Sequence, residues 1–99
     1  MATVRWTEEA VRWLKDIHDY IAVDNPDAAQ RTVEGVVNKA RELRDFPLIG
    51  YRYPLRPDRH YRVLWYGHYR IVYLVRDQNV LDIVGVYQDR KSTRLNSSH

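Results

Sequence analysis

An arginine set among aromatic and apolar residues is the feature of this sequence best suited to chemistry. Arg70 stands in the run Tyr69-Arg70-Ile71-Val72-Tyr73. Five further arginines lie between residues 46 and 88, namely Arg52, Arg56, Arg59, Arg62 and Arg76. The planar guanidinium group binds phosphate or carboxylate through paired hydrogen bonds and stacks on aromatic rings. The pattern therefore indicates a surface for an anionic partner, although a solvated strand face can carry arginine for solubility alone.

The distribution of charge supports this interpretation. Residues 1–45 hold seven Lys or Arg against nine Asp or Glu, a net charge of −2, whereas residues 46–88 hold six against three, a net charge of +3. The histidines His18, His60 and His68 are scattered, and the sequence has no cysteine. Neither a metal site nor a cofactor is therefore indicated.

Length and composition predict one domain over residues 1–88. Residues 89–99 are polar and without periodicity, and they read like the translation of a sequencing adapter, so we expect a non-native tail there. The sequence shows no signal-peptide pattern and no apolar stretch long enough to cross a bilayer. A cytoplasmic protein without membrane association is the expectation.

Two amphipathic helices should position the arginines. A short β-prone run at residues 3–6 precedes Thr7, whose hydroxyl can cap a first helix, and Asn25-Pro26 is a typical start for a second. The first apolar stripe is Trp13, Leu14, Ile17, Tyr20 and Ile21, and the second is Ala29, Val33, Val36, Ala40 and Leu43. Both have the spacing of one helix face, so we expect an antiparallel hairpin, with Trp6 and Trp13 in the core and Gly35 at a close contact.

Beyond the helices the apolar period falls to two. We expect strands at residues 60–65, 69–76 and 80–87, and a short edge strand at 51–53 in a loop rich in proline and glycine. On the middle strand, alternation places Tyr69, Ile71, Tyr73 and Val75 toward the helices and Arg70 on the opposite face, in a shallow concavity. The predicted fold class is α+β, with an N-terminal strand and a helical hairpin packed on a three- to four-stranded antiparallel sheet.

The order of these elements resembles the RelE/ParE superfamily of bacterial toxins. The motifs that carry the resemblance are Trp6-Thr7, Tyr20-Ile21, Asn25-Pro26 with Ala28-Ala29, Phe46-Pro47 with Gly50, and Tyr69 to Tyr73. They cover nearly all of residues 3–88. The resemblance implies the toxin of a type II toxin-antitoxin system, paired with a cognate antitoxin encoded beside it.

Two activities occur in that superfamily. RelE-type members are metal-independent endoribonucleases that cut mRNA on the ribosome, and ParE-type members inhibit DNA gyrase. RelE-type enzymes use an arginine at the position of Arg70 on the scissile phosphate, and Arg62 on the neighbouring strand would be a second contact. They often carry lysines in the loop that here spans residues 47–59, which has none. The long helical hairpin and the lysine-free loop favour the ParE type.

The site residues depend on this choice. A ParE-like protein would present Arg52, Arg59, Arg62, Arg70 and Tyr87 to DNA gyrase or to the antitoxin, whereas in a RelE-like enzyme Arg70 and Arg62 would act on mRNA at the ribosome. A third alternative is a degenerate, non-toxic member that only binds its antitoxin. Gln88 stands where the family's last strand often carries histidine, next to the suspected tail, so its identity is uninformative.

Overall fold

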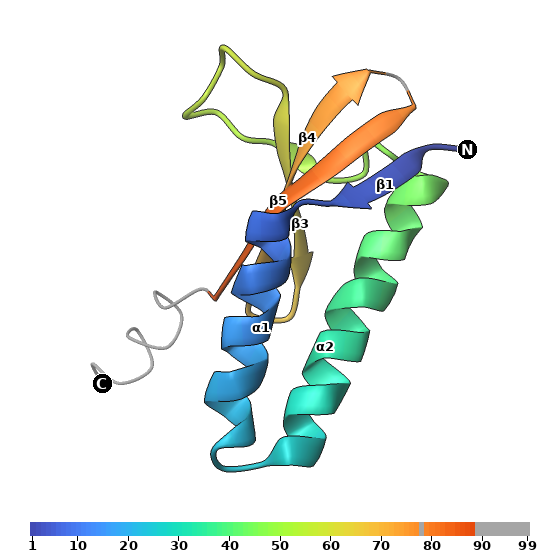
Figure 1. The fold of residues 1–99 in the computed structure, drawn as a ribbon. Helices are drawn as coiled ribbons and strands as arrows, with labels where there is room; N and C mark the ends of the chain where they lie inside the picture. Colours follow the sequence, from blue (N-terminus) through green and yellow to red (C-terminus); the bar gives the residue numbers. More distant parts are fainter. Residues whose placement is uncertain (78, 89–99) are drawn as a thin grey trace.

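Two helices pack on one face of a five-stranded sheet (Figure 1). The computed structural model describes residues 1–77 and 79–88, so the suspected tail at 89–99 and Gln78 in the last turn lie outside the described residues. The elements in chain order are β1 (Thr3–Trp6), α1 (Glu8–Ala22), α2 (Pro26–Arg41), the short 3-10 helix η1 (Glu42–Arg44), β2 (Tyr51–Arg52), β3 (Tyr61–Tyr66), β4 (Tyr69–Asp77) and β5 (Val80–Gln88). This α+β fold confirms the predicted class and order of elements.

The helices begin where their capping residues predicted. The Thr7 hydroxyl accepts a hydrogen bond from the Ala10 amide at 3.1 Å, and the Asn25 side chain accepts one from the Ala28 amide at 3.0 Å. Each bond satisfies one of the amides that the first helical turn leaves without a partner. Pro26 occupies the first position of α2, where its missing N–H costs nothing.

The sheet is wider than predicted and is mixed. Its strand order is β1-β5-β4-β3-β2, and β1 runs parallel to β5, with Thr3 opposite Val80. The other neighbouring strands are antiparallel. The predicted antiparallel strands are therefore present as β2 to β5, and the predicted N-terminal strand joins them as a fifth, parallel strand. Its place beside β5 was not predicted, because a period-two pattern identifies a strand without revealing its neighbour.

The core lies between the helices and one face of the sheet. Ile71 and Tyr73 of β4 are fully buried there in one cluster with Val36 of α2, which confirms the predicted alternation on β4. The Tyr73 hydroxyl donates to the Pro47 carbonyl at 2.9 Å and accepts from the Gly50 amide at 3.0 Å. These two bonds tie the loop after η1 to the centre of the sheet.

Two aromatic residues of α1 are more exposed than predicted. The expectation of a core position was wrong for Trp13, which is 38% exposed, and the place of Tyr20 in the buried stripe was wrong, because it is 76% exposed. Figure 1 shows the reason for Tyr20: the hairpin end of the two helices extends beyond the sheet. Trp6, in contrast, packs against the core.

Gly35 marks a close contact, as expected. It lies in α2 where the Tyr66 side chain of β3 approaches, and a Cβ at residue 35 would overlap with that ring. A helix interior normally disfavours glycine. Here the missing side chain lets β3 and α2 pack closely.

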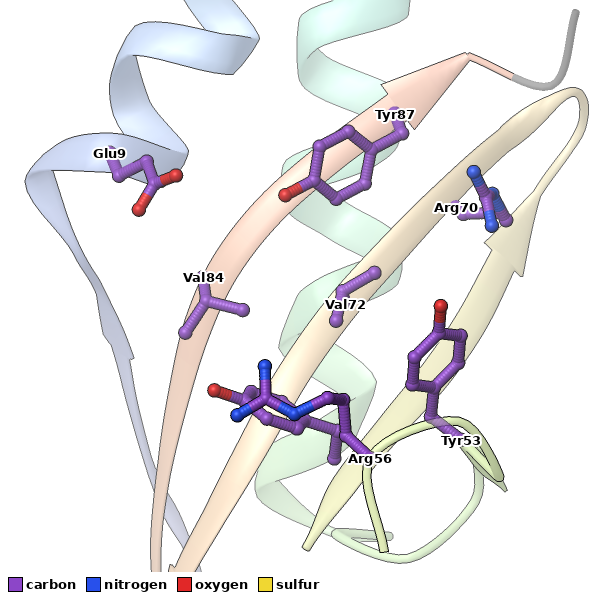
Figure 2. A pocket seen from close by; sticks show the side chains of 8 residues that line it. Glu9, Tyr53, Arg56, Arg70, Val72, Val84 and Tyr87 are labelled. Atoms are coloured by element: carbon purple, nitrogen blue, oxygen red, sulfur yellow. The ribbon is translucent and has the colours of Figure 1, made fainter. Parts of the chain in front are cut away.

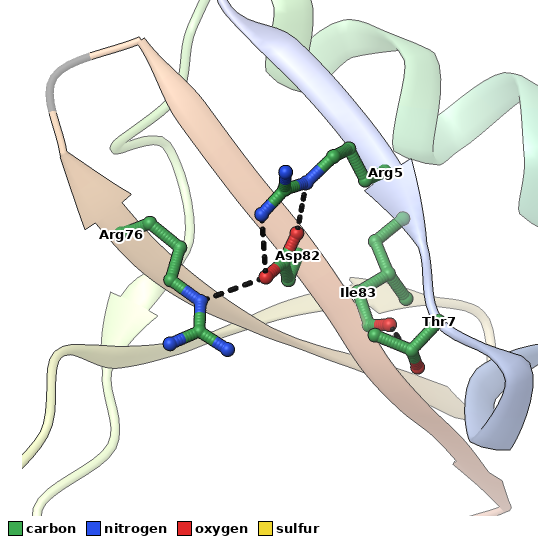
Figure 3. Close-up of polar contacts among 5 residues, drawn as sticks. All are labelled: Arg5, Thr7, Arg76, Asp82 and Ile83. Atoms are coloured by element: carbon green, nitrogen blue, oxygen red, sulfur yellow. Dashed lines mark hydrogen bonds and ion pairs between the residues drawn. The ribbon is translucent and has the colours of Figure 1, made fainter.

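A buried carboxylate fixes the parallel strand to the sheet (Figure 3). Asp82 of β5 accepts hydrogen bonds from Arg5 of β1 at 2.6 and 3.1 Å and from Arg76 of β4 at 2.8 Å. Its side chain is 7% exposed, while the arginines are about half exposed. The hydrogen bond from Arg5 is the main reason why the pKa of Asp82 is lowered. Burial opposes this shift, and the hydrogen bond from Arg76 adds to it. Thr7 adds a hydrogen bond to the Ile83 carbonyl at 2.8 Å, so β1 is held by side chains as well as by its ladder.

Candidate binding pocket on the open sheet face

The helix-free face of the sheet contains a pocket of about 500 Å³ (Figure 2). Its walls come from α1, the loop before β3, and strands β3, β4 and β5. The lining residues are Glu9, Tyr53, Arg56, Tyr61, Arg70, Val72, Val84 and Tyr87. Arg70 therefore faces away from the helices and into a concavity, as its place on β4 predicted.

Arg70 and Tyr87 form one side of the pocket. They are direct partners across the β4–β5 ladder, and the Arg70 guanidinium carbon lies 5.9 Å from the centroid of the Tyr87 ring. Trp13 packs edge-on against the same ring, with centroids 4.8 Å apart and planes at 64°. The partly exposed Trp13 thus fixes the ring on which Arg70 rests.

A second arginine and ring contact lies elsewhere in the pocket. The Arg56 guanidinium carbon is 5.7 Å from the centroid of the Tyr61 ring. Asp58 accepts from Arg56 Nε at 3.3 Å, and this hydrogen bond is the main reason why the pKa of Asp58 is lowered. The charge of Arg56 is therefore compensated within its own loop.

Unlike Arg56, Arg70 has no carboxylate partner among the described residues. Its Nε is buried and has no hydrogen-bond partner, and no carboxylate forms an ion pair with Arg70 in residues 1–77 and 79–88. Buried donors are almost always satisfied in proteins. Arg70 thus packs against the Tyr87 ring while its Nε leaves one hydrogen bond unmade within the described residues.

The phenol beside Arg70 is a donor rather than a base. Burial is the main cause that raises the pKa of Tyr87, the charge of Glu9 adds to it, and Arg70 opposes it. The hydroxyl consequently keeps its proton at neutral pH. Neither lysine nor histidine is among the eight lining residues. The pocket can bind an anion and donate hydrogen bonds, and Glu9 is the side chain among its eight lining residues that could accept a proton.

The structure separates the two arginines that a RelE-like site would combine. Arg62 pairs with Tyr73 across β3 and β4, so its side chain leaves the opposite face of the sheet from Arg70. Its Nη1 donates to the carbonyls of Gly50 at 2.5 Å and Leu48 at 3.2 Å, and its Nε donates to His60 at 3.0 Å. Arg62 is therefore engaged in holding the loop after η1.

Of the other predicted site residues, only some lie in the pocket with Arg70. Tyr87 lines the pocket with Arg70, whereas Arg52 is exposed on β2 opposite Arg62, and exposed Arg59 is outside the pocket lining. Sequence reasoning did not select Arg56, Tyr53 or Glu9 for this site. Arg56 and Tyr53 belong to a loop whose return over the sheet leaves no periodic signal, and Glu9 stands in the first turn of α1, where a carboxylate is common for helix stability alone.

Two further properties concern the part of the chain that the structure describes. No group of three or more histidine, aspartate or glutamate side chains there could hold a metal ion. None of its helices is long and apolar enough to cross a membrane.

Comparison with known proteins gives consistent results. Residues 4–92 match the family described as the ParE toxin of the type II toxin-antitoxin system parDE. A candidate toxin of Sinorhizobium fredii, Y4kP, is 34% identical over 86 residues, which are 86% of this chain and 88% of that protein.

Two solved structures are similar to this fold. A chain from the chromosomal ParDE toxin-antitoxin system of P. aeruginosa has a TM-score of 0.70 and 21% identity, covering 89% of this chain and 96% of the other. A chain of the toxin-antitoxin complex RelBE2 of Mycobacterium tuberculosis has a TM-score of 0.67 and 27% identity, covering 88% and 96%.

Proposed function

Because the chain belongs to the ParE toxin family of type II toxin-antitoxin systems, we propose that it inhibits DNA gyrase in the cytoplasm by binding to it. A cognate antitoxin binds the same toxin and neutralises it. The protein is then a binding protein rather than an enzyme. Single-domain size and a preformed pocket with an unpaired guanidinium group suit recognition of a larger partner.

The observation that carries this proposal is the chemistry around Arg70. Metal-independent RNA cleavage needs a group that removes the proton of a 2′-hydroxyl and a second group that protonates the leaving oxygen. Tyr87 and Glu9 line the pocket with Arg70, but Arg62, the second cation that a RelE-like site would use, lies on the other face of the sheet. Binding is therefore better supported than cleavage.

A RelE-like ribonuclease is the second candidate. It is favoured by the 27% identity to the RelBE2 chain and by the position of Arg70 on an open concave face. In that case Arg70 contacts the scissile phosphate, and Glu9 is the carboxylate of the pocket that could take up a proton. A degenerate member that only binds antitoxin is the third.

Two assays on one purified preparation test the proposal. The protein is added to bacterial DNA gyrase with relaxed plasmid, and separately to ribosomes programmed with a defined mRNA. We expect loss of supercoiling and intact mRNA. Arg70→Gln should relieve the inhibition, and Arg31→Gln, which changes an exposed arginine of α2, should not.

The opposite outcome identifies the alternatives. Cleavage of mRNA at the ribosomal A site, with supercoiling unaffected, would contradict the gyrase proposal and support the RelE-like candidate. No effect in either assay, together with no growth arrest on expression, would support the degenerate member.

A further inference from the structure

We infer that the pocket around Arg70 receives one carboxylate side chain of a protein partner, together with an apolar residue next to it. This inference rests on the proposed function and deepens it, because it states what a partner must present to the toxin. The carboxylate lies against the Arg70 guanidinium group and the Tyr87 hydroxyl. The apolar neighbour lies on Val72 and Val84.

The first support is the unsatisfied donor. Arg70 Nε is buried without a hydrogen-bond partner, although the half-exposed Arg5 and Arg76 share the carboxylate of Asp82. Leaving a buried donor unpaired costs free energy, and such atoms are found at sites that serve a function. A carboxylate matches the planar fork of arginine with two parallel bonds.

The second support is the charge of the pocket, which suits one negative group and not many. Arg56 is already paired with Asp58, and Glu9 contributes a negative charge to the lining. Arg70 is the cation of the lining that has no ion-pair partner among the described residues. A nucleic acid binds through many phosphates and needs several free cations along its path.

The third support is size and polarity. About 500 Å³ is more than a carboxylate group needs, and the remaining surface consists of two valines and the rings of Tyr53, Tyr61 and Tyr87. Aromatic and aliphatic walls around a few fixed polar groups are typical of a pocket that anchors one side chain of a binding partner. An acidic residue followed or preceded by leucine, isoleucine or phenylalanine fits both parts.

Selection from a random library of short displayed peptides on the immobilised full-length chain tests this inference. We expect the enriched peptides to share one aspartate or glutamate next to an apolar residue. A synthetic peptide of the enriched sequence is then titrated by fluorescence anisotropy. Replacing its acidic residue by the corresponding amide should weaken binding about tenfold or more, the loss typical of a charged hydrogen-bonded pair.

Variants of the protein locate the contact. Arg70→Gln should weaken binding of the titrated peptide by a similar factor. Arg70→Lys keeps the charge but loses the two parallel hydrogen bonds of the guanidinium group, so it should weaken binding less. Tyr87→Phe keeps the ring and removes one donor, so it should cause a smaller loss. Arg31→Gln on the exposed surface of α2 is the matched control and should bind normally. Thermal unfolding followed by circular dichroism shows that each variant is folded.

Two results would overturn the inference. One is enrichment of peptides without an acidic residue, or binding that folded Arg70→Gln leaves unchanged. The other is displacement of the peptide by a single-stranded oligouridine at lower concentration than the free peptide itself, which would make the pocket a nucleic-acid site. Either result obtained while the protein still inhibits supercoiling would leave the gyrase proposal standing, so the two failures can be told apart.

Discussion

The ring of Tyr87 lies over Gly85, so that a Cβ at residue 85 would overlap with the Tyr87 hydroxyl and ring. The two residues are two positions apart on β5 and share the open face of the sheet. Glycine at 85 therefore lets the ring lie along the strand, where Arg70 rests on it. The shape of the pocket therefore depends on the absence of a Cβ at residue 85.

Gly85→Ala is expected to weaken partner binding about as much as Tyr87→Ala does. The added methyl group displaces the ring, and Arg70 then loses its support. Because the added methyl group meets the end of the Tyr87 side chain and not backbone, the free energy of unfolding should fall by only about 1 kcal/mol. Peptide or gyrase binding by the two single variants and the double variant measures this. A double variant weakened by the sum of the single effects would contradict the dependence of one residue on the other.

Arg62→Gln should lower stability and leave binding at the pocket intact. The substitution removes hydrogen bonds to the Gly50 and Leu48 carbonyls on the far face from Arg70. We expect the free energy of unfolding in urea to fall by about 1–2 kcal/mol. Titration of the partner should give the wild-type affinity at a temperature where the variant is folded. A loss of affinity matching that of Arg70→Gln would show that both arginines serve one site.

Arg70→Met should make the domain more stable and inactive. Removing a buried donor without a partner relieves a cost of about 1–3 kcal/mol, and the lost contact with Tyr87 returns about 0.5–1 kcal/mol of it. The free energy of unfolding should therefore rise by about 1 kcal/mol while supercoiling inhibition disappears. Urea unfolding and the supercoiling assay on the same preparation give both numbers. A clear loss of stability would mean that Arg70 is satisfied within the domain.

Asp82→Asn should make the free energy of unfolding less dependent on pH in the acidic range. The pKa of Asp82 is lowered in the folded state, chiefly by its bonds to Arg5. Its contribution is therefore complete above the unfolded value of about 3.9 and is lost as pH falls through the lower folded value. At pH 7 the variant should be less stable by about 1–2 kcal/mol, because both arginines are half exposed.

Unfolding of wild type and Asp82→Asn in urea from pH 7 down to about pH 3 checks the sign. The difference between them should shrink as the pH falls below about 4. A difference that stays constant or grows over this range would show that the carboxylate charge is not what holds β1 to its neighbour. Asp77→Asn, at an exposed position near the end of β4, is the control.

The effect of Gly35→Ala on the free energy of unfolding should depend on the residue at position 66, and its sign should reverse when Tyr66 is replaced. In the wild type the methyl group meets Tyr66, and overpacking of this kind costs about 1–3 kcal/mol. In a Tyr66→Leu background the contact is gone, and alanine should stabilise α2 by about 1 kcal/mol relative to glycine. Unfolding of the four proteins tests this. A destabilising effect of equal size in both backgrounds would exclude Tyr66 as the cause.

Local patterns predicted most of this fold. The caps Thr7 and Asn25 marked the helix starts, and strict alternation on β4 placed Arg70 opposite Ile71 and Tyr73. Each of these signals arises from neighbours in sequence and from backbone geometry, so it survives without knowledge of the tertiary structure.

The errors have a common physical origin. Each error depends on which distant segments of the chain meet. This holds for the parallel pairing of β1 with β5, for the exposure of Tyr20 and for the location of Arg62. Arg62 and Arg70 are both arginines on adjacent strands, yet the pleat sends them to opposite faces, which the register of β3 and β4 decides. Arg56 was missed because a loop brings it over the sheet.

The parallel pairing of Thr3–Trp6 with Val80–Ile83 joins segments that leave the ribosome at very different times. During synthesis, β1 has no strand to pair with until β5 has emerged, and high contact order of this kind slows folding. The open face therefore acquires its final shape only after translation has passed residue 88.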